Sequence, residues 1–140
     1  MDDLIDVYKL FIRSCMEYCS VAFHSSLTIN QSEKLERIQK TCLKVILGEM
    51  YCGYDSALEM CGLEPLAKRR EAKCLNFSLK CLKNEKLKKN FPLKPKSKQG
   101  VRKNEIFVVN FAKTSTYKKS AIPYCQRLLN KHLKSLKTKS

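Results

Sequence analysis

The stretch GLEPLAKRREAKC, residues 62–74, joins two segments that both have helical patterns. Gly62 is typical of a residue that ends a helix, and Pro65 suits the first turn of a new one. We therefore predict that a short helix, capped by Asp55, ends at Gly62 and that a longer helix occupies residues 64–83.

Arg70 is expected to have a structural role in this helix. At 100° per residue, Arg70 falls in the middle of the apolar face of helix 64–83. A charge on such a face must be paired or reach solvent. We therefore predict a structural ion pair for Arg70, with an acid such as Asp55 or Glu59.

Arg69 is expected to lie on a different side and to form a basic line with Lys73 and Lys80. Such a line is usually a solvated helix face, but here it leads into a lysine-rich segment. A continuous basic track suits a phosphate backbone. The candidate nucleic-acid-binding residues are Arg69, Lys73, Lys80, Arg37, Lys44, Lys96, Lys98, Arg102, Lys103, Lys118, Lys119 and Arg127.

Further helices are predicted on both sides of this stretch. Residues 3–23 have a wide apolar face and a narrow polar strip that includes Glu17, which predicts a helix buried on most sides. Thr28 and Gln31 form a capping-box pattern before a helix that ends at Gly48. The segment SAIPYCQRLLNKHLKSL is expected to form the last helix.

These patterns predict a mainly α fold with two parts. Residues 1–89 are expected to form a small helical bundle. Residues 90–140 are expected to form a basic linker, an extended segment and a short C-terminal helix. The linker NFPLKPKSKQG contains two prolines, and the β-prone run EIFVVNF at 105–111 should be a strand or extended.

The net charge of +15 is divided unevenly along the chain. Residues 1–66 hold 6 Lys/Arg and 10 Asp/Glu, a net of −4, whereas residues 67–140 hold 22 Lys/Arg and 3 Glu, a net of +19. This asymmetry favours a polyanionic partner over a membrane surface, with a solvated lysine-rich tail as the alternative. Because no apolar run approaches about 20 residues and no secretory signal is visible, we expect an intracellular protein, nuclear or cytoplasmic.

Neither a metal site nor a catalytic site is predicted. The eight cysteines form no C-x-x-C pair and the chain has two histidines, so buried thiols in a reducing compartment are expected. Asp2 and Asp3 are similar to the aspartate pair of polymerase palms, but they lead directly into a helix, where acidic residues favour the N-terminus. No cofactor is expected.

Four blocks carry a resemblance to a known family: FIRSCMEYCSVAFHSSLT, KLERIQKTCLKVILG, YDSALEMCGLEPLAKRREAKC and SAIPYCQRLLN. In this order they resemble the C-terminal part of non-LTR (LINE-type) retrotransposon reverse transcriptases, with the jockey-like group most similar. Arg69 and Arg70 match the paired arginines of the third block. The last block is matched by Ser120, Pro123, Leu129 and Asn130. The family usually has a Trp where this chain reads AFHSS.

The resemblance implies a thumb-like helical bundle and the basic segment that follows it in an RNA-directed DNA polymerase. This part of the family's proteins grips the RNA template and its DNA copy. The implied partners are RNA, DNA or an RNA–DNA hybrid, together with the polymerase palm. The catalytic palm and the endonuclease are not in this sequence, so no enzymatic activity is expected.

Two alternatives to nucleic-acid gripping remain from the sequence. One is a helical protein–protein interaction module, because the helix at 64–83 has a second apolar line that suits a further neighbour. The other is a decayed open reading frame without a selected function. The sequence alone does not separate these three.

Overall fold

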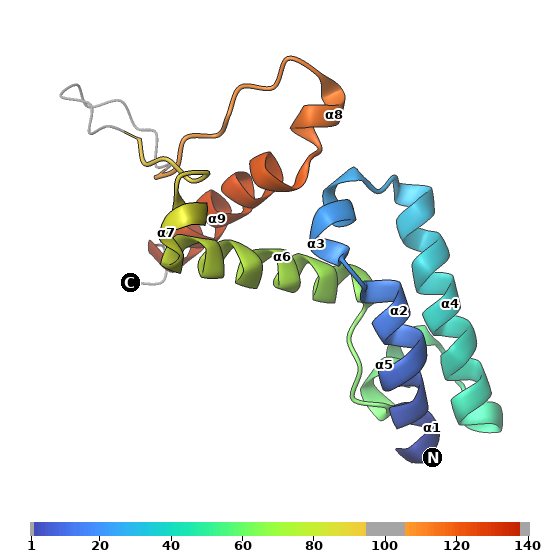
Figure 1. Ribbon diagram of the computed structural model, residues 1–140. Coiled ribbons are helices and arrows are strands. Elements are labelled where there is room, and N and C mark those ends of the chain that lie inside the picture. Colours follow the sequence, from blue (N-terminus) through green and yellow to red (C-terminus); the bar gives the residue numbers. More distant parts are fainter. Residues whose placement is uncertain (1, 95–105, 138–140) are drawn as a thin grey trace. The chain divides into compact units, whose positions relative to one another are not determined.

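Helices account for most of the chain in the computed structural model, which describes residues 2–94 and 106–137 (Figure 1). In order, the helical elements are α1 (Asp2–Val7), the π-helical turn η1 (Tyr8–Ile12), α2 (Arg13–Glu17), α3 (Ser20–Phe23), the 3₁₀ turn η2 (His24–Ser26), α4 (Ile29–Leu47), the 3₁₀ turn η3 (Gly48–Met50), α5 (Tyr54–Met60), α6 (Leu66–Lys83), α7 (Glu85–Lys88), α8 (Ser115–Lys118) and α9 (Ala121–Lys137). The predicted mainly α fold is confirmed.

The chain forms two compact units, each described by itself below. Unit 1 comprises Met1–Ser20 and Leu27–Ala72, and unit 2 comprises Val21–Ser26 and Lys73–Ser140. The division falls within α6. Unit 1 holds 9 Lys/Arg and 11 Asp/Glu, a net of −2, whereas unit 2 holds 19 Lys/Arg and 2 Glu, a net of +17. The charge asymmetry of the sequence therefore follows the structural division.

Helix α4 of unit 1 begins and ends where the sequence predicts. The Thr28 hydroxyl accepts a hydrogen bond from the Gln31 backbone N–H at 3.2 Å, and the Gln31 side chain accepts one from the Thr28 N–H at 2.9 Å. This reciprocal pair satisfies two backbone donors at the helix start. Gly48, at φ 53°, ends the helix in a left-handed conformation that glycine adopts without a Cβ penalty.

Helices α5 and α6 also follow the predicted punctuation closely. Gly62, at φ 58°, ends the α5 segment, and the Leu63 N–H donates to the Leu58 carbonyl at 2.8 Å. Helix α6 then begins immediately after Pro65. The predicted cap differs: Asp55 lies in the first turn of α5, and Gly53 occupies the N-cap position.

The first predicted helix, residues 3–23, is interrupted and presents a different face from the one expected. The π-helical turn Tyr8–Ile12 has more residues per turn than an α-helix, so it rotates the side chains that follow about the helix axis. As a result Glu17 is buried, while Phe11 is 67% exposed. Cys19, at φ 50°, then breaks the helix before α3. The prediction of a helix buried on most sides is therefore wrong.

Each unit has its own apolar core. The core of unit 1 is formed by Ile5, Tyr8, Leu43, Leu47, Ala57, Leu58, Cys61 and Leu63. That of unit 2 is formed by Cys74, Cys81, Phe91, Phe107, Cys125, Leu128 and Leu129. Helix α9 supplies three of the latter, so its buried face holds unit 2 together and leaves its polar face at the surface.

The β-prone segment is extended, but it forms no strand within the described ranges 2–94 and 106–137. It makes an isolated antiparallel bridge between Leu93 and Phe107. Further backbone groups of this segment bond Asn130 of α9, whose Oδ1 accepts from the N–H groups of Ile106 and Phe107 at 3.0 and 2.9 Å. Asn130 Nδ2 also donates to the Phe107 carbonyl at 3.0 Å. A buried side chain therefore takes the place of a second strand.

The cysteines form no disulfide in the part of the chain that the structure describes. Four are buried as the sequence predicts: Cys61, Cys74, Cys81 and Cys125. Burial raises the pKa of the Cys125 thiol. Contrary to expectation, three are exposed: Cys15, Cys19 and Cys52. No helix of the described residues has both the length and the apolar character needed to cross a bilayer.

Candidate nucleic-acid interface

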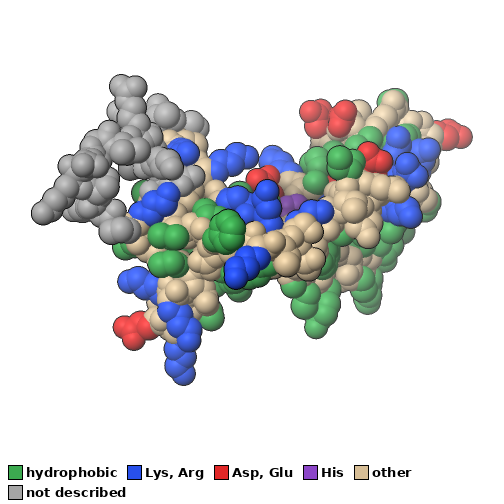
Figure 2. Space-filling model, turned by 90° about the horizontal axis from the view of Figure 1, so that it is seen from above, with side chains coloured by type: hydrophobic (Ala, Val, Ile, Leu, Met, Phe, Trp, Pro, Cys, Tyr) green, Lys and Arg blue, Asp and Glu red, His purple; other side chains and the backbone are tan. Residues whose placement is uncertain are grey.

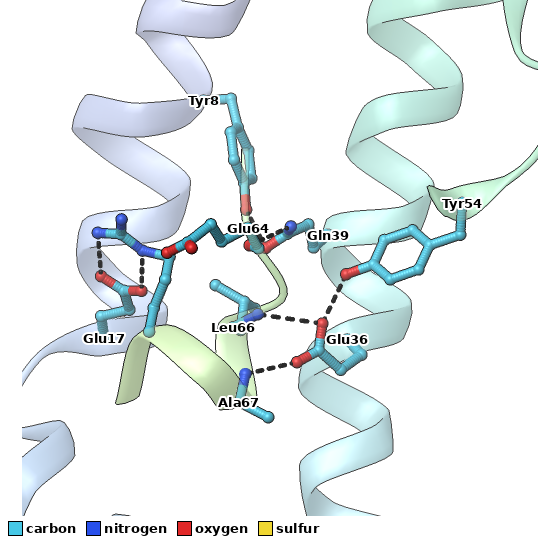
Figure 3. Close-up of polar contacts among 9 residues, drawn as sticks. Tyr8, Glu17, Glu36, Gln39, Tyr54, Glu64, Leu66 and Ala67 are labelled. Carbon is cyan, nitrogen blue, oxygen red and sulfur yellow. Dashed lines mark hydrogen bonds and ion pairs between the residues drawn. The ribbon is translucent and has the colours of Figure 1, made fainter. Parts of the chain in front are cut away.

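Arg69 forms an ion pair inside unit 1, a contact that the sequence reasoning did not predict. Its Nε donates to Oε1 of Glu17 at 2.8 Å and its Nη2 donates to Oε2 at 3.3 Å (Figure 3). The Glu17 side chain is 3% exposed and that of Arg69 is 29% exposed. The hydrogen bond to Glu17 raises the pKa of Arg69. The rotation imposed by η1 places Glu17 inside the unit, and Arg69 neutralises it there.

Arg70 is fully buried, so its predicted place on the apolar face of α6 is confirmed. Its Nη2 donates to the Ser32 hydroxyl at 2.9 Å. The acids suggested from the sequence, Asp55 and Glu59, are both exposed on α5. Both side chains therefore serve the fold of unit 1, Arg69 through Glu17 and Arg70 through Ser32.

Glu36 of α4 is a second structural carboxylate of unit 1. Its oxygens accept hydrogen bonds from the Ala67 N–H at 2.7 Å, the Leu66 N–H at 3.3 Å and the Tyr54 hydroxyl at 2.6 Å (Figure 3). A carboxylate at this place satisfies backbone donors at the start of α6 and complements its dipole. Burial, together with this hydrogen bond, raises the pKa of Tyr54 well above its usual value.

The remaining buried polar groups around Glu36 also connect helices of unit 1. The Tyr8 hydroxyl donates to Oε1 of Gln39 at 2.8 Å, and the Gln39 amide donates to the Glu64 carbonyl at 3.1 Å (Figure 3). These contacts join α4 to η1 and to the loop before α6. Each polar atom in this series of hydrogen bonds has a partner within the fold, which is typical of a structural network.

The two candidate residues on α4 make local contacts. Arg37 Nη2 lies 4.0 Å from a Glu33 carboxylate oxygen, with the Arg37 side chain 72% exposed. Lys44 Nζ lies 5.5 Å from the centroid of the Tyr51 ring, a cation–π geometry. Both belong to unit 1, whose net charge is −2.

The basic line predicted on α6 is divided by the boundary between the units. Arg69 belongs to unit 1, and Lys73 and Lys80 belong to unit 2. Lys73 is half-buried, whereas Lys80 is exposed. Four further candidates lie outside the residues that the structure describes: Lys96, Lys98, Arg102 and Lys103.

The structure brings three of the predicted candidates together at α8 and α9. Arg127 Nη2 donates to the Lys118 carbonyl at 2.8 Å, at the C-terminal end of α8. A cation at a helix C-terminus is favourable because the last carbonyls carry partial negative charge. Lys119 follows directly, and the Ser25 hydroxyl donates to its carbonyl. All three basic side chains are exposed.

Two basic residues that the sequence reasoning missed continue this group along α9. Lys131 and Lys134 follow Arg127 at spacings of four and seven, and both are exposed. The helical period of the predicted last helix was sufficient to find them. We define the α8–α9 basic patch as Lys118, Lys119, Arg127, Lys131 and Lys134.

Other exposed lysines lie on α7 and beside it. These are Lys83, Lys86, Lys88 and Lys89. On the face drawn in Figure 2, Lys and Arg side chains occur at many points, with fewer Asp and Glu side chains among them. In the described part of unit 2, Glu85 is the single acidic side chain.

The described residues offer no metal centre. No group of three or more His, Cys, Asp or Glu side chains is placed to hold a metal ion in residues 2–94 and 106–137. Asp2 and Asp3 lie in the first turn of α1, the position expected for acids that favour a helix N-terminus.

Comparison with protein-family models, with curated proteins and with solved structures finds no match to this chain.

Proposed function

We propose that this chain is a non-catalytic nucleic-acid-binding element in which unit 2 contacts the phosphate backbone of RNA, DNA or an RNA–DNA hybrid. In this proposal it corresponds to the C-terminal gripping region of a non-LTR reverse transcriptase and works inside the cell, in the nucleus or the cytoplasm. The sequence blocks described above supply the parentage, and the α8–α9 basic patch supplies the contact surface.

The observation that supports this function best is the coincidence of charge and fold. The net charge of +17 belongs to unit 2 alone, while unit 1 has a net charge of −2. Basic side chains of this density repel one another, and a polyanion relieves that repulsion. Release of counterions from the phosphates provides the driving force for such binding.

Salt-titrated binding of the full chain tests the proposal. The variant combines Lys118→Gln, Lys119→Gln and Arg127→Gln, and the probe is a fluorescent duplex of arbitrary sequence. Each lost phosphate contact should flatten the plot of log K against log salt by about 0.9, so three should flatten it by about 2.7. Binding should weaken most at low salt.

A matched control removes three exposed cations from α4 of unit 1: Lys34→Gln, Arg37→Gln and Lys40→Gln. This control has the same change in net charge, so it separates the local patch from a general electrostatic effect. Equal loss of affinity in both variants would assign the binding to total charge and not to the patch. Salt-independent binding of this duplex and of single strands, or no binding of either, would contradict the proposed function itself.

A second feature favours a protein partner for unit 1. The α1–α2 segment leaves large apolar side chains in solvent, with Leu10 68%, Phe11 67% and Tyr18 77% exposed. Exposed apolar side chains in a group are typical of interaction surfaces. Within the proposed parentage, the polymerase palm is the occupant of this face. Co-expression with such a palm should yield a complex that Phe11→Asp disrupts and that Ile29→Asp, an exposed α4 site, leaves intact.

A further inference from the structure

Two aromatic rings lie exposed in the extended segment and helix that lead into the α8–α9 basic patch. Phe111 is 84% exposed and Tyr117 is 42% exposed. Lys113, between them in the sequence, is also exposed. A phenyl ring left largely in water buries little of its apolar area, and a ligand that covers the ring would gain that burial.

The backbone beside Phe111 is anchored to the same helix that carries the patch. The Asn110 N–H donates to Oε1 of Gln126 at 3.0 Å, and Gln126 is fully buried. The Gln126 amide in turn donates to the Asn90 carbonyl at 2.7 Å. Gln126 directly precedes Arg127 on α9. The hydrogen bond from Asn110, the neighbour of Phe111, therefore ties this segment to the turn of α9 that carries Arg127.

Tyr117 is tied to the same anchor. The Asn110 side-chain amide donates to the Tyr117 hydroxyl at 3.3 Å, and Tyr117 directly precedes Lys118. The start of α8 is fixed by Thr114, whose hydroxyl accepts from the Tyr117 N–H at 3.2 Å. The backbone next to Phe111 and that of Tyr117 are therefore anchored by hydrogen bonds, near the cations of the α8–α9 basic patch.

Basic side chains combined with exposed aromatic rings suit single-stranded nucleic acid better than a duplex. A duplex presents phosphates outward but keeps its bases stacked inside, so a protruding ring finds no base face. A single strand offers both its phosphates and the faces of its bases. Base–aromatic stacking is insensitive to sequence because every base has a π-face. We propose that the α8–α9 patch binds single-stranded nucleic acid, with Phe111 and Tyr117 stacking on its bases.

This inference rests on the proposed function and specifies its ligand class. An anionic lipid surface would also attract cations and aromatic rings. However, the apolar face of α9 is buried in the core of unit 2, where Cys125 and Leu129 are fully buried. The middle of the apolar face of α9 is therefore already occupied by the core and does not face a bilayer, which favours the single strand.

The test compares Phe111→Leu and Phe111→Tyr in the full chain. The probes are fluorescent oligothymidylate, oligouridylate and a hairpin duplex with the same number of phosphates. Phe111→Leu keeps an apolar side chain and loses the ring, so affinity for both single strands should fall about 5- to 150-fold. Phe111→Tyr should bind as the unchanged protein does, and the duplex affinity should change little in either variant.

The salt slope should stay the same in Phe111→Leu, because no phosphate contact is lost. Ile29→Ala, at a site 82% exposed on α4 of unit 1, controls for the loss of any exposed apolar side chain. Unchanged single-strand affinity in Phe111→Leu, or an equal loss for the duplex, would overturn the stacking inference while leaving phosphate binding intact. Tighter binding of phosphatidylserine vesicles than of any oligonucleotide would overturn it in favour of a lipid surface. Failure of every probe to bind would refute the proposed function together with this inference.

Discussion

Arg69→Ala should destabilise unit 1 strongly, although the residue lies in a run of three basic residues that looks like a surface feature. The substitution leaves the Glu17 carboxylate, 3% exposed, without the guanidinium that contacts both of its oxygens. Removing one partner of a buried ion pair costs about 3–5 kcal/mol, because the remaining charge is buried and uncompensated. The partial exposure of Arg69 places the expected loss at the lower end, at about 3 kcal/mol.

Thermal unfolding followed by circular dichroism measures this loss. A free-energy change of 1 kcal/mol shifts the melting temperature of a small domain by about 4–8 °C, so the transition of unit 1 should fall by at least about 12 °C. The matched control is Arg37→Ala, whose side chain is 72% exposed and whose nearest acid lies 4.0 Å away. Exposed pairs contribute about 0–1 kcal/mol, so the control should melt within a few degrees of the unchanged protein.

The double variant Glu17→Met with Arg69→Met separates the pair from its surroundings. Replacing both charges by apolar side chains removes the uncompensated carboxylate, so this variant should be more stable than Arg69→Ala alone. Its salt slope for nucleic-acid binding should match that of the unchanged protein. If Arg69→Ala melts as the control does and flattens the salt slope, Arg69 is a phosphate ligand and the ion-pair assignment is refuted.

Three further predictions follow from the described contacts of unit 1. Thr28→Ala removes the hydroxyl of the capping box and should cost about 1 kcal/mol in a denaturant titration, whereas Thr28→Ser should cost little; equal losses would contradict the cap. Gly62→Ala has open space around its Cβ but keeps a φ of 58°, so backbone strain alone should cost about 1–2 kcal/mol in the same assay; an unchanged midpoint would contradict a left-handed Gly62. Burial and Glu36 raise the pKa of Tyr54, so the stability that this tyrosine contributes is complete below about pH 10 and declines as the pH rises further. Glu36→Gln should lower the pH at which Tyr54 ionises in an absorbance titration, and an unchanged ionisation would contradict their hydrogen bond.

Much of the fold could be predicted because its helix ends depend on local chemistry. The capping box of Thr28 and Gln31, the left-handed Gly48 and the left-handed Gly62 all act within a few residues of the helix that they end. Their effect is therefore visible in a short window of sequence. The burial of Arg70 was predictable for the same reason, since helix α6 is regular and its phase at residue 70 follows from the helical period.

The first helix shows where this reasoning fails. A regular period of 3.6 residues places Glu17 on the polar side, but the π-helical turn Tyr8–Ile12 changes the phase before that residue is reached. No residue type in YKLFI marks a π-helical turn. Cys19 likewise adopts a positive φ that glycine or asparagine adopts more readily, so it gave no signal of a break.

The wrong phase predicted for the first helix also concealed the contact between Glu17 and Arg69 in the candidate site. The role of Arg69 depends on where Glu17 points, and Glu17 lies 52 positions earlier in the chain. No pattern within residues 62–74 contains that information. Lys118 and Arg127 are nine residues apart, on neighbouring helices, and the positive charge of the segment already indicated a basic group there. A basic patch built from neighbouring elements is therefore predictable in a way that a buried ion pair between distant elements is not. We therefore place the proposed phosphate contact on α8 and α9, where exposed cations lie near one another. Arg69 and Arg70 of α6 instead contact Glu17 and Ser32 within unit 1.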